Sequence, residues 1–168
     1  MTSDLPRITI VTPSFNTADY LERTIDSVLS QRYPMLEYIV VDGGSTDGSV
    51  EIIRRYADHL SWWISEPDQG QADAINKGFG KATGTIFGWL NSDDILLPGA
   101  LATVGRIFAD FPQIAWLTSS RATYIDTDGS ITRLVNAPPK AGSLIRRGMY
   151  NGLVLGFVNQ ESTFWRRE

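Results

Sequence analysis

Four short groups of polar residues each follow an apolar run in the N-terminal part of this chain. The groups are Thr12-Pro13-Ser14 with Asn16, Asp42-Gly43-Gly44, Glu66-Pro67-Asp68, and Asn91-Ser92-Asp93-Asp94. If the apolar runs are parallel strands, their carboxyl ends meet at one edge of a sheet, where such sheets bind ligands. Carboxylates gathered there raise one another's pKa unless a cation or a hydrogen-bond donor compensates. A hard divalent cation, which prefers oxygen ligands, is the simplest compensation.

Asp93 and Asp94 are the candidates for a metal site, because they directly follow a strongly apolar run. Two adjacent aspartates after a strand also suit a turn and a helix cap before Pro98, and taken alone that interpretation is the better one. Acids after two other apolar runs favour the functional interpretation of Asp93 and Asp94.

Asp42 has two interpretations of about equal weight. Its carboxylate suits a cap for the next helix through the Gly43-Gly44 turn. An ionised carboxylate is also a pure acceptor, which suits the imide N–H of a ligand. The glycines allow a planar group to approach the backbone closely.

The elements that position these residues alternate along the chain. Strands are predicted over 8–11, 38–41, 61–64, 85–90 and 114–117, and helices over the apolar stripes 21–29, 50–60, 72–82 and 101–111. This alternation predicts an α/β fold with a mostly parallel central sheet and helices on both of its faces. After the fifth strand, residues 122–125 and 130–135 flank an Asp-Thr-Asp-Gly turn and predict a β-hairpin.

Composition excludes several classes of function. The chain has 168 residues, a net charge of −4 and no cysteine, which argues against nucleic-acid binding and excludes thiolate metal sites and cysteine nucleophiles. The only histidine, His59, lies in a polar helical segment and does not suit a Ser-His-Asp triad.

No apolar run is long enough to span a bilayer, and no signal-peptide pattern is present, so we expect a cytoplasmic location, including the cytoplasmic face of a membrane.

Six motifs, in this order, resemble those of a family 2 glycosyltransferase. They are ITIVTPSFN (8–16), SVLSQ (27–31), EYIVVDGGSTDG (37–48), SEPDQGQADAINKG (65–78), NSDD (91–94) and QESTFWRR (160–167). The resemblance covers most of the chain and is strongest over 8–98. It implies a GT-A fold, a Rossmann-like α/β domain that binds a nucleotide sugar with a metal on the donor diphosphate.

The resemblance also implies roles for the matched residues. It places Thr12, Pro13, Ser14, Asn16, Asp42, Gly43, Asp68, Asn76 and Asp93 in the nucleotide-binding site, and Asp94 with Asp93 at a bound Mn²⁺ or Mg²⁺. Asp42 would hold the base, Asp68 would contact the base or the ribose, and Asp94 would coordinate the metal directly. Two positions depart from the family, which often has a second acid at Gly43 and an arginine at Ile75.

The implied reaction moves a sugar from a nucleoside diphosphate sugar, of UDP type, to a hydroxyl of a saccharide or lipid-linked acceptor with inversion, as in polysaccharide or glycoconjugate synthesis. The general base of the family usually follows a segment like 160–167. Glu161 is the only acid in that segment, and its alternative role is to pair with Arg166 or Arg167. We therefore expect a truncated single domain with little turnover. Residues 7–120 would form the nucleotide-sugar half, and 121–168 the start of an acceptor half.

Two other functions use the same features. One is a non-catalytic nucleotide-sugar or protein-binding module on the same fold, in which Asp94→Asn would leave protein binding intact. The other is a receiver-like phosphotransferase, which would have its acid pair after the first strand, where this chain has Thr12-Pro13-Ser14.

Overall fold

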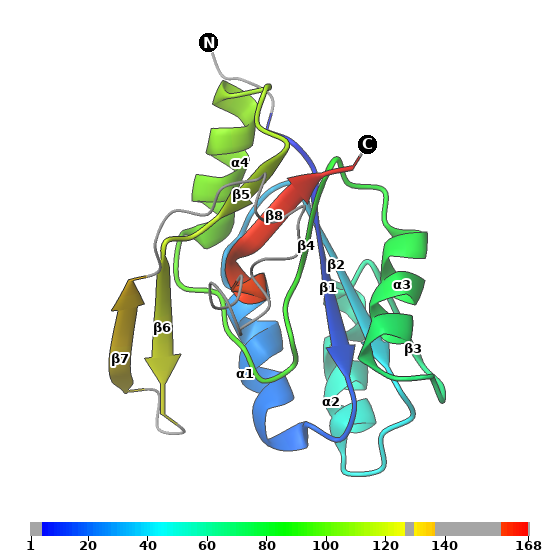
Figure 1. Ribbon diagram of the computed structural model, residues 1–168. Coiled ribbons are helices and arrows are strands. Elements are labelled where there is room, and N and C mark those ends of the chain that lie inside the picture. The colour runs from blue at the N-terminus through cyan, green and yellow to red at the C-terminus, as the bar shows by residue number, and fades with distance from the viewer. Residues whose placement is uncertain (1–4, 127–129, 137–158, 168) are drawn as a thin grey trace.

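Strands and helices alternate along the chain in the order that the sequence predicts (Figure 1). The computed structural model of the protein describes residues 5–126, 130–136 and 159–167. The strands are β1 (Ile8–Ser14), β2 (Leu36–Asp42), β3 (Trp62–Ser65), β4 (Ile86–Trp89), β5 (Trp116–Thr118), β6 (Arg121–Ile125), β7 (Ile131–Asn136) and β8 (Thr163–Arg166). The helices are α1 (Ala18–Leu29), α2 (Ser49–Tyr56), α3 (Gln71–Lys81) and α4 (Ala100–Asp110), with short 3₁₀ turns η1 (Ala57–His59) and η2 (Gln160–Ser162).

The central sheet has six strands in the order β3-β2-β1-β4-β8-β5. β1 pairs in parallel with β2 and β4, and β2 pairs in parallel with β3. The predicted mostly parallel sheet is therefore confirmed. β8, which was not predicted from the sequence, runs antiparallel between β4 and β5 and separates the fifth strand from the fourth.

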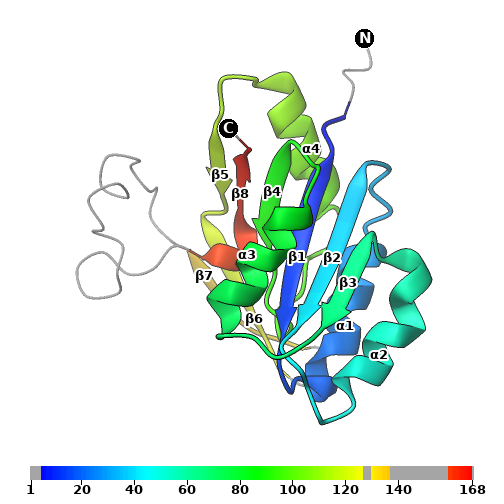
Figure 2. The ribbon, with the colours of Figure 1, turned by 90° about the vertical axis from the view of Figure 1, so that its right-hand side faces the viewer.

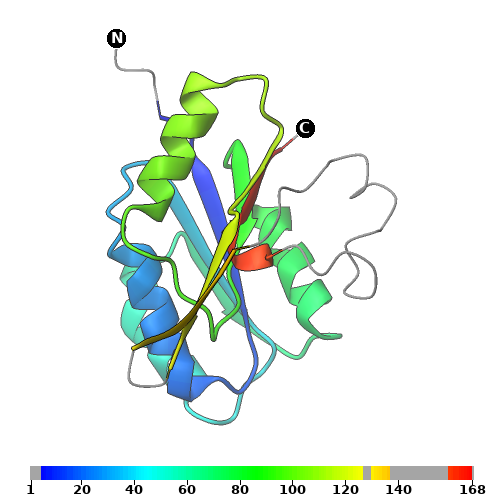
Figure 3. The ribbon, with the colours of Figure 1, turned by 60° about the vertical axis from the view of Figure 1, so that its left-hand side comes forward.

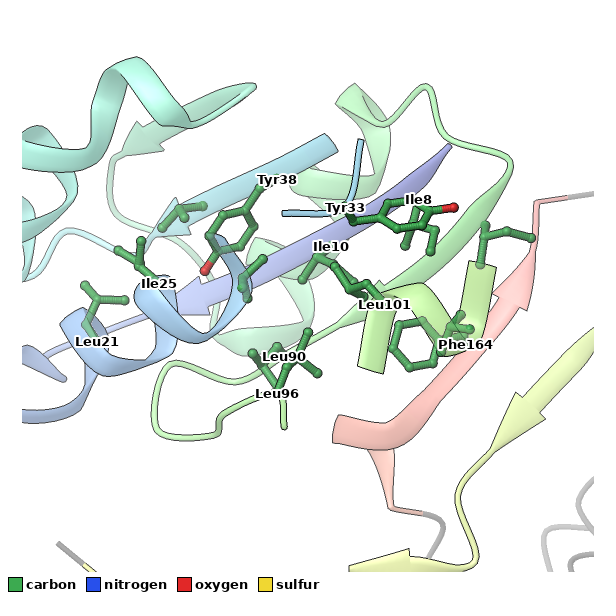
Figure 4. Close-up of a cluster of buried hydrophobic side chains, with 14 of the residues drawn as sticks. Ile8, Ile10, Leu21, Ile25, Tyr33, Tyr38, Leu90, Leu96, Leu101 and Phe164 are labelled. Carbon is green, nitrogen blue, oxygen red and sulfur yellow. The ribbon is translucent and has the colours of Figure 1, made fainter. Parts of the chain in front are cut away.

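Helices cover both faces of this sheet. α1, α2 and α4 lie on one face and α3 on the other (Figures 2 and 3). The larger core lies under the three helices, where Ile10 and Tyr38 of the sheet pack with Leu21 and Ile25 of α1 (Figure 4). These side chains are almost entirely buried, so the apolar stripe that predicted α1 is the face that packs on the sheet.

α3 lies close to β1 on the opposite face. A Cβ placed on Gly78 would come within 2.5 Å of Val11 Cγ1, so the missing side chain allows this close packing. Phe79 of α3 stacks on Phe87 of β4, and Trp165 of β8 packs edge-on against both rings. The unpredicted strand β8 is therefore part of the core of this face.

β6 and β7 form a separate two-stranded antiparallel sheet, which confirms the predicted hairpin after the fifth strand. Tyr124, Ile131 and Leu134 of this hairpin are exposed. None of the helices in the ranges given above has the length and apolarity needed to cross a bilayer.

Candidate active site

The four predicted polar groups meet at the edge of the sheet where β1, β2, β3 and β4 end, which is the lower edge in Figure 1. Main-chain hydrogen bonds tie the strand ends together. Gly43 N donates to Ser14 O (2.8 Å), Glu66 N to Asp42 O (3.0 Å) and Leu90 N to Val11 O (2.9 Å). The convergence of these groups follows from the parallel register of the strands.

Thr12, Pro13 and Ser14 form the buried floor of this edge. All three lie within β1, and Thr12 Oγ1 lies 3.1 Å from the buried Tyr38 hydroxyl. Ser14 Oγ lies 3.3 Å from Thr17 Oγ1. Thr12 and Ser14, which were predicted to line the nucleotide-binding site, therefore use their hydroxyl groups in contacts inside the protein.

Asn16 connects the first two loops. Its backbone has a left-handed φ of 51°, its Oδ1 accepts from Thr46 N (2.9 Å), and its own N donates to Ser45 Oγ (2.8 Å). Asparagine tolerates this conformation better than most residues. The contacts fix the loop after β1 against the loop after β2.

Asp42 is fully buried and organises the turn that follows it. Its Oδ2 accepts from Gly44 N (3.0 Å), Ser45 N (2.9 Å) and Ser65 Oγ (2.7 Å), and its Oδ1 accepts from Ser45 Oγ (2.5 Å). All four donors lie in the turn after β2 or in β3, and none belongs to α2. The Asp42 carboxylate therefore holds the turn, but the prediction that it caps the next helix is wrong, since the N-cap position of α2 is Gly48. Contact with a base stays a prediction, and Oδ1, with one internal donor, is the oxygen with capacity left.

Asp68 lies directly over Gly43. A Cβ on Gly43 would meet Asp68 Oδ2 at 2.8 Å, and Asp68 Oδ1 accepts from Gly70 N at 2.7 Å. The loops after β2 and β3 therefore place one carboxylate in the volume that a side chain at position 43 would fill.

Asn76 lies on the exposed surface of α3, and its side chain makes no hydrogen bond within the described ranges. Its neighbour Lys77 forms ion pairs with Glu66 (3.1 Å) and Asp73 (3.2 Å). The hydrogen bond to Glu66 is the main cause that raises the pKa of Lys77. Asn76 is thus separate from the buried contacts of the strand ends.

The loop after β4 is anchored to α1. Thr17 Oγ1 lies 2.9 Å from Ser92 Oγ, and the buried Thr24 Oγ1 donates to Ser92 O and to Asp94 O, both at 2.8 Å. The loop also contacts the start of α3, because Gln71 Nε2 donates to Asn91 Oδ1 (2.8 Å). The fourth polar group is therefore held from two sides.

Asp93 and Asp94 have different surroundings. Asp93 is exposed and lines a hollow of about 250 Å³ between α1 and β6, together with Tyr20 and Ile125. Asp94 is half-buried, and desolvation, with the charges of Asp93 and Glu161, raises its pKa to about 6. Two neutral amides, Asn91 and Gln160, oppose this shift by hydrogen bonding to its carboxylate.

Glu161 lies in η2 and approaches Asp94 closely enough for their charges to interact. Its alternative role, pairing with Arg166 or Arg167, is wrong for the structure. Arg166 donates to Ile114 O and Phe108 O, and Arg167 donates to Ala82 O. No ion pair joins Glu161 to either arginine within the part of the chain that the structure describes.

The donor set at this edge suits a divalent cation that is bound together with a diphosphate. Within residues 5–126, 130–136 and 159–167, no group of three or more histidine, cysteine, aspartate or glutamate side chains is arranged so that it could hold a metal ion by itself. Mg²⁺ typically binds one or two carboxylates and completes its shell with substrate phosphates and water. Asp94, a half-buried carboxylate with like charges beside it, fits that kind of site, with Asp93 as the second candidate.

Sequence reasoning missed the contributions of Gln160 and Thr24. Gln160 Nε2 donates to Asp94 Oδ2 at 3.0 Å, across 66 positions of the sequence. Its only signal in the sequence was the late motif of the resemblance, which did not indicate a partner. Thr24 lies within the helical stripe of α1, where a threonine gives no sign that its hydroxyl faces another loop.

Comparisons with known proteins agree with this geometry. A sequence model of the family described as Glycosyl transferase family 2 matches residues 9–150. An uncharacterized glycosyltransferase of Mycobacterium tuberculosis is 43% identical over 90 residues, which are 53% of this chain and 34% of the relative. The chain spans about a third of the length of that relative and of others with similar names.

Two solved structures share the fold. The mannosyltransferase PcManGT from Pyrobaculum calidifontis, in complex with GDP-Man and Mn²⁺, has a TM-score of 0.63 and 31% identity over 70% of this chain and 36% of its own. S. aureus TarS, in complex with UDP-GlcNAc, has a TM-score of 0.68 and 18% identity over 95% of this chain and 45% of its own. The architecture is therefore of the GT-A type.

Proposed function

The chain belongs to glycosyl transferase family 2, and on that premise we propose that it transfers a sugar from a nucleoside diphosphate sugar to an acceptor hydroxyl, with inversion and with the help of a divalent cation. The observation that carries the proposal is the position of Asp94. Its carboxylate is half-buried at the edge where four loops meet, close to two other acids and bonded to two neutral amides. A carboxylate in these surroundings is stabilised by a cation that a ligand brings.

The donor nucleotide is proposed to lie across the loops after β1, β2 and β3. Asp42 and Asn16 fix the loop after β2, and the Asp68 carboxylate lies over Gly43 beside it. Asp68 Oδ2, which accepts no hydrogen bond from the residues that the structure describes, is the acceptor available to a base or ribose. Asn76 and Asp93 are exposed and complete the proposed nucleotide-binding set.

Asp94, with Asp93, would hold Mn²⁺ or Mg²⁺. When bound, the cation stabilises the negative charge that grows on the leaving diphosphate. The chain's own contribution is to keep the Asp94 carboxylate in place, through Thr24 on its carbonyl and Gln160 on its side chain. PcManGT, solved with GDP-Man and Mn²⁺, supports a metal-bound donor but not a uracil base, so UDP and GDP are both candidates.

Glu161 is the proposed acceptor-side acid. It would accept the proton of the attacking hydroxyl, provided that the acceptor enters beside η2. Residues 7–120 would then serve the donor, and residues from 121 onward the acceptor, a saccharide or lipid-linked hydroxyl. The structure describes only parts of that second segment, namely 121–126, 130–136 and 159–167.

Calorimetry of nucleotide binding tests the donor half of the proposal. We expect UDP or GDP to bind at least tenfold more tightly with Mn²⁺ than without it. We expect UMP and GMP, which lack the second phosphate, to show no such gain. Equal affinities with and without Mn²⁺ for both diphosphates would overturn the proposed metal-assisted mechanism.

Release of nucleoside diphosphate from UDP-glucose or GDP-mannose tests the role of Glu161. Glu161→Gln should lower the rate of release at least tenfold and leave nucleotide affinity within twofold. The matched control is Ser162→Ala in the same short helix, whose hydroxyl donates to Asn159 O. An unchanged rate in Glu161→Gln would place the general base elsewhere in the chain.

A further inference from the structure

Gln160 connects the last strand of the sheet to the proposed metal-binding acid. It begins η2, directly before β8, which lies between β4 and β5 (Figure 2). The Gln160 Nε2 donates to Asp94 Oδ2 at 3.0 Å. The loop after β4 and the segment before β8 therefore meet through one side-chain hydrogen bond.

The other end of the same amide has no partner. Gln160 Oε1 is buried and is the one side-chain atom of the described residues that is buried without a hydrogen bond. Burying a carbonyl oxygen unpaired carries a desolvation cost, and such groups in folded proteins call for an explanation. The Gln160 side chain thus donates a hydrogen bond to the Asp94 carboxylate, while its own carbonyl oxygen accepts none from the described residues.

The contacts of Asp94 divide between backbone and side chain. Thr24 Oγ1 holds its carbonyl at 2.8 Å, which fixes the main chain of the loop. Asn91, three residues before Asp94, bonds to its carboxylate from within the loop, whereas Gln160 does so from a distant element. Thr24 thus anchors the main chain of the loop, whereas Gln160 contacts only the carboxylate of Asp94 and can set its orientation.

We propose that Gln160 is a positioning residue, which holds the Asp94 carboxylate in the orientation needed to bind a divalent cation with a nucleoside diphosphate. This inference rests on the proposed function. A purely structural role for Gln160 would make the opposite prediction for stability, because a structural hydrogen bond should stabilise the free protein. The unpaired Oε1 indicates that Gln160 contributes little net stability.

Gln160→Met separates the two roles, because methionine keeps the length of the side chain and removes both polar ends. Replacing both ends of a polar side chain by an apolar one of similar shape is often neutral or stabilising. We expect the melting temperature of the ligand-free variant to stay within about 2 °C of the wild type or to rise. We expect the affinity for GDP or UDP with Mn²⁺ to fall at least tenfold, and the affinity without Mn²⁺ to stay the same.

A double variant shows whether the effect passes through Asp94. In the Asp94→Asn background, Gln160→Met should cause no further loss of affinity for GDP or UDP measured in the presence of Mn²⁺, because the carboxylate that it positions is gone. Gln160→Asn, which keeps the amide but is one methylene too short to reach, should bind as weakly as Gln160→Met. It replaces Gln160→Met if that variant does not fold.

Each outcome decides the matter. If Gln160→Met binds like the wild type, or if its melting temperature and affinity fall together, the positioning role is overturned. Further loss in the Asp94→Asn background overturns it as well. If the wild type itself shows no Mn²⁺-dependent binding, both the proposed function and the positioning role of Gln160 are overturned. Binding by the wild type and by the Ser162→Ala control shows that only the role of Gln160 is in question.

Discussion

The Asp68 carboxylate occupies the space in which a side chain at Gly43 would lie. A Cβ on Gly43 would be 2.8 Å from Asp68 Oδ2 and 3.1 Å from its Cγ. The φ of Gly43 lies outside the left-handed region that favours glycine, so contact with Asp68, and not backbone conformation, favours a glycine here. The two residues come from loops after different strands, and their fit sets the position of an acid at the proposed nucleotide site.

Gly43→Ala should therefore displace Asp68. Because the atoms in the way are at the end of a side chain, we expect a modest loss of stability, about 1 kcal/mol. The affinity for UDP or GDP should fall at least fivefold in calorimetry. In the Asp68→Ala background the same substitution should have almost no effect on affinity, and an equal loss in both backgrounds would contradict the proposed coupling.

Thr24→Val tests the anchoring of the loop after β4. Valine keeps the shape of the buried threonine but leaves Ser92 O and Asp94 O without its hydroxyl donor. We expect a loss of about 1–3 kcal/mol in the free energy of unfolding, measured by urea denaturation, together with weaker Mn²⁺-dependent nucleotide binding.

Thr103→Val is the matched control, because the exposed Thr103 hydroxyl donates to the carbonyl of Gly99, the N-cap residue of its own helix α4. Its stability should stay within about 0.5 kcal/mol of the wild type. An equal loss in the free energy of unfolding in Thr24→Val and Thr103→Val would mean that the hydrogen bonds of Thr24 to the loop after β4 do not stabilise the fold.

Most of the sheet could be predicted from the sequence because β1, β2 and β4 are apolar runs that the helices cover on both faces. β8 could not, since its four residues pair with Ile86–Phe87 and with Trp116–Thr118, far away in the sequence. Such pairing leaves no local periodicity in a short segment.

The candidate site was predictable in its location but not in its contacts. The position of Asp94 at the sheet edge follows from the strand order, whereas its bond to Gln160 depends on β8, which was not predicted. Asp42 shows a second limit. Its residue type suits both a helix cap and a ligand contact, whereas its four internal donors show that the carboxylate holds the turn after β2 and accepts from Ser65 of β3.

Glu37 should stabilise the fold in a pH-dependent way, at the opposite end of β2 from the site. Desolvation raises its pKa, but hydrogen bonds from Thr9, Thr83 and Gly84 outweigh that effect, so the net pKa is lowered. The stabilisation is present above the unfolded pKa and is lost as the pH falls through the folded one.

Glu37→Gln should therefore be less stable than the wild type at pH 7, and the difference should shrink as the pH falls below about 4. Urea denaturation at several pH values measures it, and nucleotide binding should not change. Glu51→Gln, at an exposed carboxylate of α2, is the control for the removal of a surface carboxylate. A difference for Glu37→Gln that stays constant with pH would contradict the role of its charge.

Asp94→Asn should have opposite effects on stability and on binding. The pKa of Asp94 is raised to about 6, chiefly by desolvation, so the folded state disfavours the charged carboxylate. Its contribution to stability is greatest below the unfolded pKa and declines as the pH rises through about 6. Asparagine carries no such charge and can still accept from Gln160 Nε2.

Without ligand, Asp94→Asn should therefore melt at a higher temperature than the wild type at pH 7.5, and the two should converge near pH 4. The same substitution should abolish the Mn²⁺-dependent gain in nucleotide affinity, because a neutral amide binds a divalent cation far more weakly than a carboxylate. Thermal unfolding and calorimetry on one preparation measure both effects. If the variant is less stable than the wild type at pH 7.5, Asp94 has a structural role and the prediction is wrong. If the variant is more stable but no longer binds nucleotide in an Mn²⁺-dependent way, the function of the Asp94 carboxylate is to bind the cation.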